Sequence, residues 1–116
     1  MAPEYVLKDG VLTVYKEMDF DYDVGFDRSC NELINMPFDK LIIDLSRIRR
    51  ITSTYIGLMA AAFFQARQRG KTIAIIAHGS VLHALHLAGF ENFIKLTDSG
   101  RFKVVKSAPE TEPVQL

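Results

Sequence analysis

The sequence predicts an α/β domain in which helices pack over a mixed β-sheet of four to five strands. Two local patterns predict this fold class. The first is a pair of β-rich runs, residues 5–8 and 11–15, separated by Asp9 and Gly10. Asp-Gly between such runs indicates an antiparallel hairpin, because both turn residues must tolerate a positive φ angle. The chain is therefore expected to open with two antiparallel strands.

The second pattern is a long helix-favouring segment between two short apolar runs. The runs, residues 41–44 and 72–77, are rich in Ile, and Gly70 marks the end of the helix between them. A strand, a helix and a strand in this order favour a right-handed βαβ unit. The two strands are therefore predicted to be parallel, to lie in one sheet and to be buried on both faces.

A shorter helix is predicted between the hairpin and the first of these parallel strands. The acidic stretch 17–27 suits the start of a helix, where carboxylates interact favourably with the helix dipole, and Pro37 ends it. An aspartate at every second position of 19–23 also matches part of a calcium-binding loop. That loop needs Gly at its sixth position and Glu at its twelfth, which here are Val24 and Cys30. A helix start is the favoured interpretation.

The remaining elements follow the second parallel strand. Ser80 is expected to cap a short helix over 81–88 that ends at Gly89, and residues 93–96 favour an edge strand. Residues 101–106 alternate between polar and apolar side chains, which predicts a short strand or extended segment instead of a terminal helix.

Composition and charge exclude several functional classes. With 116 residues, 48% of them hydrophobic and 24% charged, the chain is an ordinary globular domain. Its formal net charge is zero, so it lacks the electrostatic footprint of a protein that binds nucleic acid or an anionic membrane. Cys30 is the single cysteine, which excludes an internal disulfide and favours a reducing compartment. With no signal peptide and an uncharged run, 51–66, too short to span a bilayer, a cytoplasmic protein without membrane insertion is expected.

The sequence contains no motif for catalysis, a cofactor or a metal. There is no G-x-S-x-G pattern around Ser53, no Gly-rich phosphate loop and no cysteine pair. His83 and His86 lie about one helical turn apart, but no Cys or carboxylate has a matching spacing, so solvated histidines are the favoured interpretation. A protein that is not an enzyme, with no cofactor and no metal, is expected.

Three hydroxyl residues, Thr52, Ser53 and Thr54, precede the long helix, which has no charged side chain until after residue 66. A hydroxyl at the N-cap accepts a hydrogen bond from an unpaired backbone N–H, so Thr52 or Ser53 can be a simple cap. A helix too apolar for one core face also leaves surface for a partner. A hydroxyl beside such a surface is well placed to be a phosphorylation switch, and the residues alone leave both interpretations open.

This stretch resembles the STAS domain (sulfate transporter and anti-sigma-factor antagonist). The family pattern is roughly D-L-S, an apolar residue, a spacer, an apolar residue and then D-S-S-G-L-G. Thr52 stands where the pattern has Asp, and Tyr55 stands where it has the first Gly. The matching positions are Asp44-Leu45-Ser46, Ile48, Ile51 and the run 52–57. The resemblance extends over nearly the whole chain and implies a single STAS-like domain over residues 1–106. Residues 107–116, with two prolines, are expected to form a disordered tail.

The resemblance also implies a function. In the antagonists of this family, the serine that matches Ser53 is phosphorylated by a partner kinase. The chain is therefore expected to bind an anti-sigma factor that is also a serine kinase, with a phosphatase that resets the switch and with Thr54 as the rival acceptor. The expected partner-binding residues are Thr52, Ser53, Thr54, Tyr55, Ile56, Leu58 and Met59.

Two alternatives to this switch remain. Some STAS domains are constitutive adaptor subunits of lipid-transport or scaffold complexes, and the two departures at Thr52 and Tyr55 favour that function. The weaker alternative is a small ligand or nucleotide whose phosphate lies at the helix N-terminus near Ser53. The sequence offers nothing that would bind a base or a ribose.

Overall fold

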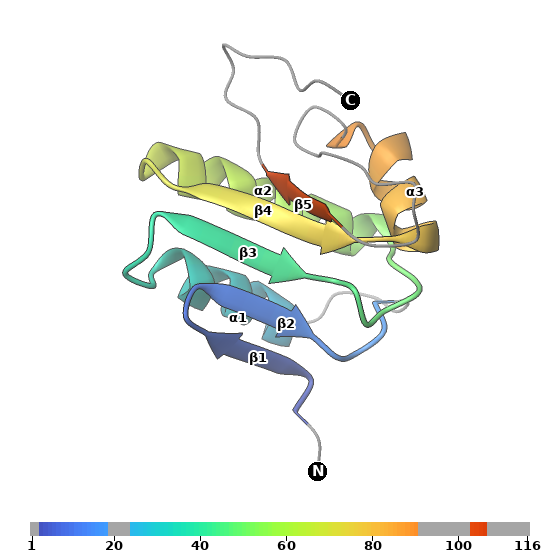
Figure 1. The fold of residues 1–116 in the computed structure, drawn as a ribbon, viewed down its shortest axis with the longest axis horizontal. Coiled ribbons are helices and arrows are strands. Elements are labelled where there is room, and N and C mark those ends of the chain that lie inside the picture. Colours follow the sequence, from blue (N-terminus) through green and yellow to red (C-terminus); the bar gives the residue numbers. More distant parts are fainter. Residues whose placement is uncertain (1–2, 19–23, 91–102, 107–116) are drawn as a thin grey trace.

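The computed structural model describes residues 3–18, 24–90 and 103–106. Figure 1 shows a sheet with the helices packed on it. The elements in chain order are β1 (Tyr5–Lys8), β2 (Val11–Val14), α1 (Val24–Ile34), β3 (Lys40–Asp44), α2 (Ser53–Gln68), β4 (Thr72–Ala77), α3 (Gly79–Leu87) and β5 (Lys103–Lys106).

The sheet has five strands in the order β1-β2-β3-β4-β5. The predicted hairpin is confirmed: β1 and β2 are antiparallel, and Asp9 and Gly10 have φ angles of 52° and 81°. The predicted βαβ unit is also confirmed, because β3 and β4 are parallel neighbours in this sheet. β2 pairs in parallel with β3, and β5 pairs antiparallel with β4. Residues 103–106 thus form the short strand that their alternating pattern predicts.

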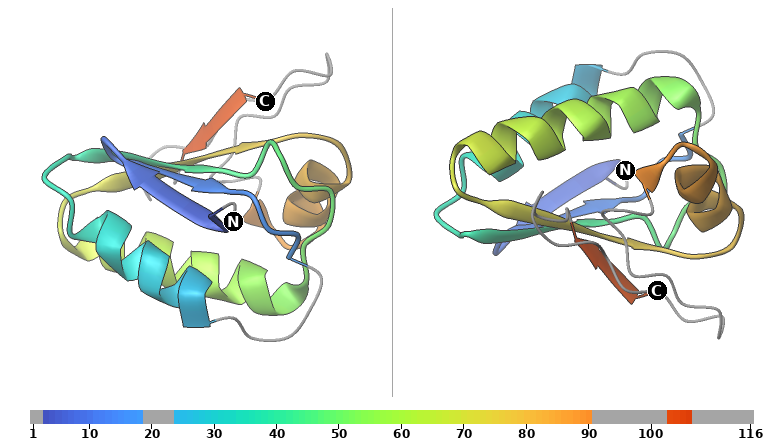
Figure 2. Two further views of the ribbon diagram at one scale, coloured as in Figure 1. Left: turned by 90° about the horizontal axis from the view of Figure 1, so that it is seen from below. Right: turned by 90° about the horizontal axis from the view of Figure 1, so that it is seen from above.

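Helices α1 and α2 both cover the same face of the sheet (Figure 2). In β3, Leu41 and Ile43 point towards the helices and are buried, whereas Ile42 and Asp44 on the other face are only half-buried. The prediction that this strand is buried on both faces is therefore wrong. Right-handed crossovers that add parallel strands in one direction put successive helices on one side of the sheet, so α1 and α2 do not cover its other face.

Aromatic side chains join the two helices to the first strand. The ring of Tyr55 in α2 packs edge-on against Phe26 in α1, with 5.5 Å between the centroids, and Phe26 contacts Tyr5 in β1 at 5.9 Å. Edge-to-face pairs of this kind stabilise a core beyond their buried area. Tyr55 is 1% exposed, so it belongs to the core.

The predicted cap of α3 is wrong. The helix begins at Gly79, with His78 at the N-cap position, so Ser80 lies inside the first turn. Its hydroxyl donates a hydrogen bond to the backbone oxygen of Arg49 in another loop. The predicted edge strand at 93–96, the tail at 107–116 and the aspartates of 19–23 lie outside the described residues.

A stability test can compare two glycines, Gly10 in the hairpin turn and Gly70 after α2. Gly10 and Gly70 both have positive φ, 81° and 73°, but a Cβ on Gly10 would lie 3.2 Å from the Phe38 ring, whereas a Cβ on Gly70 would meet nothing within 4 Å. Gly70→Ala is expected to cost about 1–2 kcal/mol of unfolding free energy from backbone strain. Gly10→Ala should cost more, because the ring must also move.

Urea unfolding of the two variants and of the wild type measures the difference. Equal losses for the two variants would contradict a contribution from the Phe38 contact.

Candidate functional site

Three loops meet at one edge of the sheet. Because β2, β3 and β4 run parallel, their carboxyl ends point the same way. The loop after β2 contains Glu17 and Met18, the loop after β3 contains residues 45–52, and β4 passes directly through His78 into α3. Loops that a rigid scaffold positions in this way commonly carry functional residues.

Two polar contacts hold the start of the loop after β3. The carboxylate of Asp44 accepts a hydrogen bond from the backbone N–H of Ser46 at 2.9 Å, which forms a local turn. Nε2 of His78 lies 2.9 Å from the backbone oxygen of Ser46, and this ties the loop to the start of α3. Leu45 and Ile48 are buried and anchor the loop to the core.

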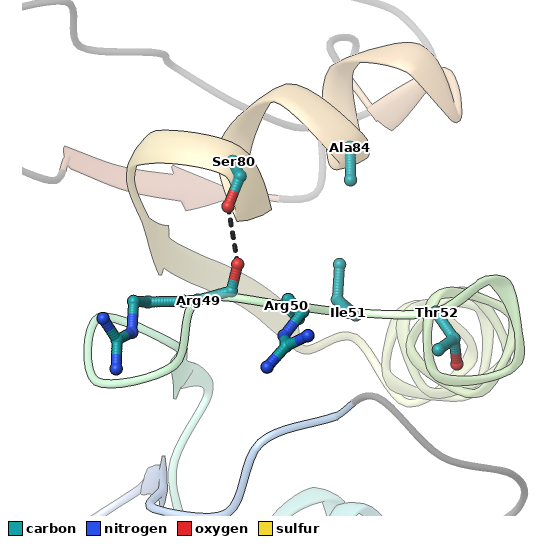
Figure 3. A pocket seen from close by; sticks show the side chains of 6 residues that line it. All are labelled: Arg49, Arg50, Ile51, Thr52, Ser80 and Ala84. Carbon is teal, nitrogen blue, oxygen red and sulfur yellow. Dashed lines mark hydrogen bonds between the residues drawn. The ribbon is translucent and has the colours of Figure 1, made fainter.

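Further along the same loop, the backbone at Arg49 and Arg50 is held from two sides. Oε1 of Glu17 accepts hydrogen bonds from the N–H groups of Arg49 and Arg50 at 2.9 Å and 3.0 Å. Oγ of Ser80 donates to the backbone oxygen of Arg49 at 2.5 Å, as Figure 3 shows. The N–H of Met18 donates to the backbone oxygen of Arg50 at 3.3 Å. The sequence analysis missed Glu17 and Ser80, because no spacing rule links residues so far apart in the chain.

A pocket of about 370 Å³ lies between this loop and α3. Figure 3 shows Ser80 and Ala84 of α3 facing the loop. Two arginines and no acidic residue occur among the lining residues, which are Arg49, Arg50, Ile51, Thr52, Ser80 and Ala84. The Glu17 carboxylate, which accepts hydrogen bonds from the backbone of both arginines, adds a negative charge to the same corner, so charges of both signs meet there.

The three hydroxyl residues take different positions. Thr52 is the N-cap residue of α2, but its side chain makes no capping hydrogen bond. Its Oγ1 is buried and has no hydrogen-bond partner among the described residues. Of the two interpretations left open by the sequence, a cap formed by the Thr52 hydroxyl is therefore not observed. Ser53 and Thr54 begin the first turn, and both are exposed.

The expected partner-binding residues divide between core and surface. Tyr55 and Met59 are 1% and 0% exposed, so their side chains belong to the core and are not available to a partner. Ile56 and Leu58 are half-buried. The outer face of α2 instead presents residues that the sequence analysis did not select, namely Gly57, Ala60, Ala61 and Phe64. Phe64 is 56% exposed, which is unusual for a phenylalanine and makes this uncharged face apolar.

Other candidate groups lie away from this edge. In the part of the chain that the structure describes, no three His, Cys, Asp or Glu side chains come close enough together to hold a metal ion. None of the helices in that part is long and apolar enough to cross a membrane. Cys30 is buried in α1, and burial, followed by the charge of Asp27, raises the pKa of its thiol to about 12.

Comparisons with known proteins agree with this fold. The STAS domain profile matches residues 2–102, so the chain belongs to the STAS domain family. The structure resembles the crystal structure of an anti-sigma factor antagonist from Mycobacterium paratuberculosis, with a TM-score of 0.63 and 21% sequence identity. The match covers 75% of this chain and 76% of that chain, and it shows a shared fold. No curated protein matches the chain at the level of similarity required of a relative.

The buried Thr52 hydroxyl leads to a prediction about stability. A buried hydroxyl without a partner costs about 1–3 kcal/mol, so Thr52→Val should leave the unfolding free energy unchanged or raise it. Thr54→Val, at an exposed position of the same turn, should change it by less than about 0.5 kcal/mol and is the matched control. Urea unfolding measures both. A loss of about 1 kcal/mol or more for Thr52→Val would show that the hydroxyl does cap α2 in solution.

The raised pKa of Cys30 predicts a stability change at high pH. The ordinary pKa of a cysteine thiol is 9.0, and burial in the folded protein raises the pKa of Cys30 to about 12, so above pH 9 the unfolded chain loses this proton first. The folded state then binds more protons than the unfolded state, and stability falls as pH rises from 9 to 12, by about 1.4 kcal/mol per pH unit at most.

Cys30→Ala lacks this titration. The stability difference between wild type and Cys30→Ala should therefore be constant below about pH 8.5 and should shift against the wild type above pH 9. Denaturant unfolding at several pH values measures it. A difference that does not depend on pH would contradict the burial of the thiol.

Proposed function

We propose that this STAS protein is a non-enzymatic regulatory binding module of the anti-sigma-factor-antagonist kind. It docks an anti-sigma factor that is also a serine kinase, and phosphorylation at Ser53 releases that partner until a phosphatase removes the phosphate. The observation that carries the proposal is the exposure of the Ser53 side chain at the first residue of α2, beside the uncharged outer face of that helix. In this proposal the domain spans residues 1–106 and the protein works in the cytoplasm.

The docking surface in this proposal differs from the set expected from sequence. It comprises Thr52, Ser53, Thr54 and the half-buried Ile56 and Leu58. The surface continues along the outer face of α2 through Gly57, Ala60, Ala61 and Phe64. Tyr55 and Met59 support this surface from the core.

The switch has a simple electrostatic basis. A phosphoserine carries about −1.5 to −2 charges at neutral pH, and at a helix N-terminus this charge is favourable for the protein itself. The same charge would be desolvated unfavourably when a partner packs on the apolar outer face. Phosphorylation should therefore weaken docking without unfolding the domain.

The second candidate is a constitutive STAS adaptor in a lipid-transport or scaffold complex. Thr52 favours it, because Thr52 replaces the family Asp beside the acceptor and its hydroxyl is buried. Tyr55, which replaces the first Gly of the family pattern, does little to favour the adaptor over the switch. Its side chain points into the core against Phe26, so it does not alter the surface that a partner meets.

Labelling with the partner kinase tests the switch. Wild-type protein should take up phosphate from ATP at Ser53, and Ser53→Ala should lose labelling yet keep docking, since the outer face of α2 is unchanged. Ser53→Asp should weaken docking, although it carries less charge than phosphate. Its matched control is Thr54→Asp, because Thr54 is exposed in the same turn and is the rival acceptor.

Mass-spectrometric mapping of the phosphate and a binding titration measure the two effects. Labelling that persists in Ser53→Ala, or docking of Ser53→Asp with wild-type affinity, would contradict the proposed switch and favour the constitutive adaptor.

A further inference from the structure

We propose that Glu17 and Ser80 are positioning residues that hold the Arg49–Arg50 peptide group from opposite sides and thereby set how Ser53 is presented to the kinase. The proposal rests on the proposed function in taking Ser53 as the phosphate acceptor. It assigns a role to two residues outside the helix that carries the acceptor: Glu17 lies in the loop after β2, and Ser80 lies in the first turn of α3.

Glu17 and Ser80 both hold one peptide plane. The carbonyl of Arg49 and the N–H of Arg50 belong to the same planar group, which moves as a unit. Ser80 Oγ donates to that carbonyl at 2.5 Å, and Glu17 Oε1 accepts from that N–H at 3.0 Å. A rotation of the plane about its flanking bonds therefore breaks both hydrogen bonds at once.

Hydrogen bonds, rather than burial, fix this plane. Arg49 and Arg50 are exposed residues, so their side chains give the backbone little support from the core. Ser80 is exposed too, whereas Glu17 is half-buried and accepts a second hydrogen bond, from the N–H of Arg49. A charged acceptor strengthens such bonds.

The held peptide connects directly to the acceptor. After Arg50, Ile51 forms a bridge with Met18, and the backbone oxygen of Thr52 accepts the first hydrogen bond of α2, from Ile56 at 3.1 Å. Only Ile51 and Thr52 separate the held plane from Ser53. A changed plane at Arg50 therefore changes the direction in which the chain enters the first turn of α2.

Phosphoryl transfer depends strongly on such placement. The serine oxygen must line up with the γ-phosphate, and a displacement of about 1 Å can cost on the order of 100-fold in rate. The outer face of α2 does not take part in the hydrogen bonds of Glu17 and Ser80. Loss of either residue should therefore lower kcat for Ser53 phosphorylation and leave KM nearly unchanged.

The test compares residues that keep the hydrogen bond with residues that remove it. Glu17→Ala and Ser80→Ala remove the acceptor and the donor. Glu17→Gln and Ser80→Thr retain an oxygen acceptor and a hydroxyl donor. Glu32→Ala and His83→Ala are matched controls, since both change exposed side chains, whereas Glu17 and Ser80 make the hydrogen bonds to the Arg49–Arg50 peptide. Two readouts are used: hydrogen exchange at the Arg50 amide, and kcat and KM for Ser53 phosphorylation by the partner kinase.

Both alanine variants should speed exchange at the Arg50 amide and lower kcat about tenfold, whereas the Gln, Thr and control variants stay near wild type. The double variant Glu17→Ala/Ser80→Ala should cost less than the product of the single effects, because both residues hold one plane. If Glu17→Ala fails to fold, the exposed Ser80→Ala decides alone.

The possible outcomes separate the two proposals. Phosphorylation of Ser53 with unchanged kcat in both alanine variants overturns the positioning role and leaves the switch intact. Unchanged exchange at Arg50 also overturns it. A wild-type protein that the kinase does not label at Ser53 overturns the proposed function, and with it any role of these residues in presenting the acceptor.

Discussion

The parallel arrangement of β2, β3 and β4 is the constraint on which the rest of the structure depends. Parallel strands end at one edge, and right-handed crossovers return each connection over the same face. Together they bring the loops that hold Glu17 and Arg49 into contact with each other and with Ser80 at the start of α3, although these residues are far apart in sequence. The same crossovers put α1 and α2 side by side on one face, where Tyr55 and Phe26 pack together. The site is thus a product of topology as much as of any motif.

The two sides of α2 explain how one helix can be part of the core and also present an apolar surface. Its inward side buries Tyr55, Met59, Ala62, Phe63 and Ala66, which accounts for its attachment to the sheet. Its outward side carries no charge between Ser53 and Gln65, and nothing within the described residues covers it. At Gly57 an added Cβ would meet no atom within 4 Å, so the fold itself does not require glycine there. Folding therefore does not fix which residues stand on the outer face, and docking of a partner can determine them.

The sequence predicts the strands and helices better than the orientation of their side chains. Asp9-Gly10 and the paired apolar runs are local signals, and local signals suffice for the hairpin and the βαβ unit. The rotation of α2 was not predictable, because residues 55–64 contain no polar side chain that marks the solvent side. Tyr55 and Met59 were therefore expected on the surface, yet they are buried. The hydroxyls of Thr52 and Ser80 depend on tertiary neighbours that capping rules do not include.

The strand order has a consequence for how the chain acquires its fold. Within the described residues, each strand pairs only with its neighbours in the sequence, so the spatial order is the chain order. Each new strand can therefore dock on a sheet edge that already exists, over a single intervening connection, and no early strand has to wait for a distant partner. Only the β1–β2 hairpin is local, since each parallel pair is separated by a helix in the chain and must close a long loop before its contacts form. During synthesis, the sheet can grow in one direction as the chain leaves the ribosome, with the β1–β2 hairpin as its first template.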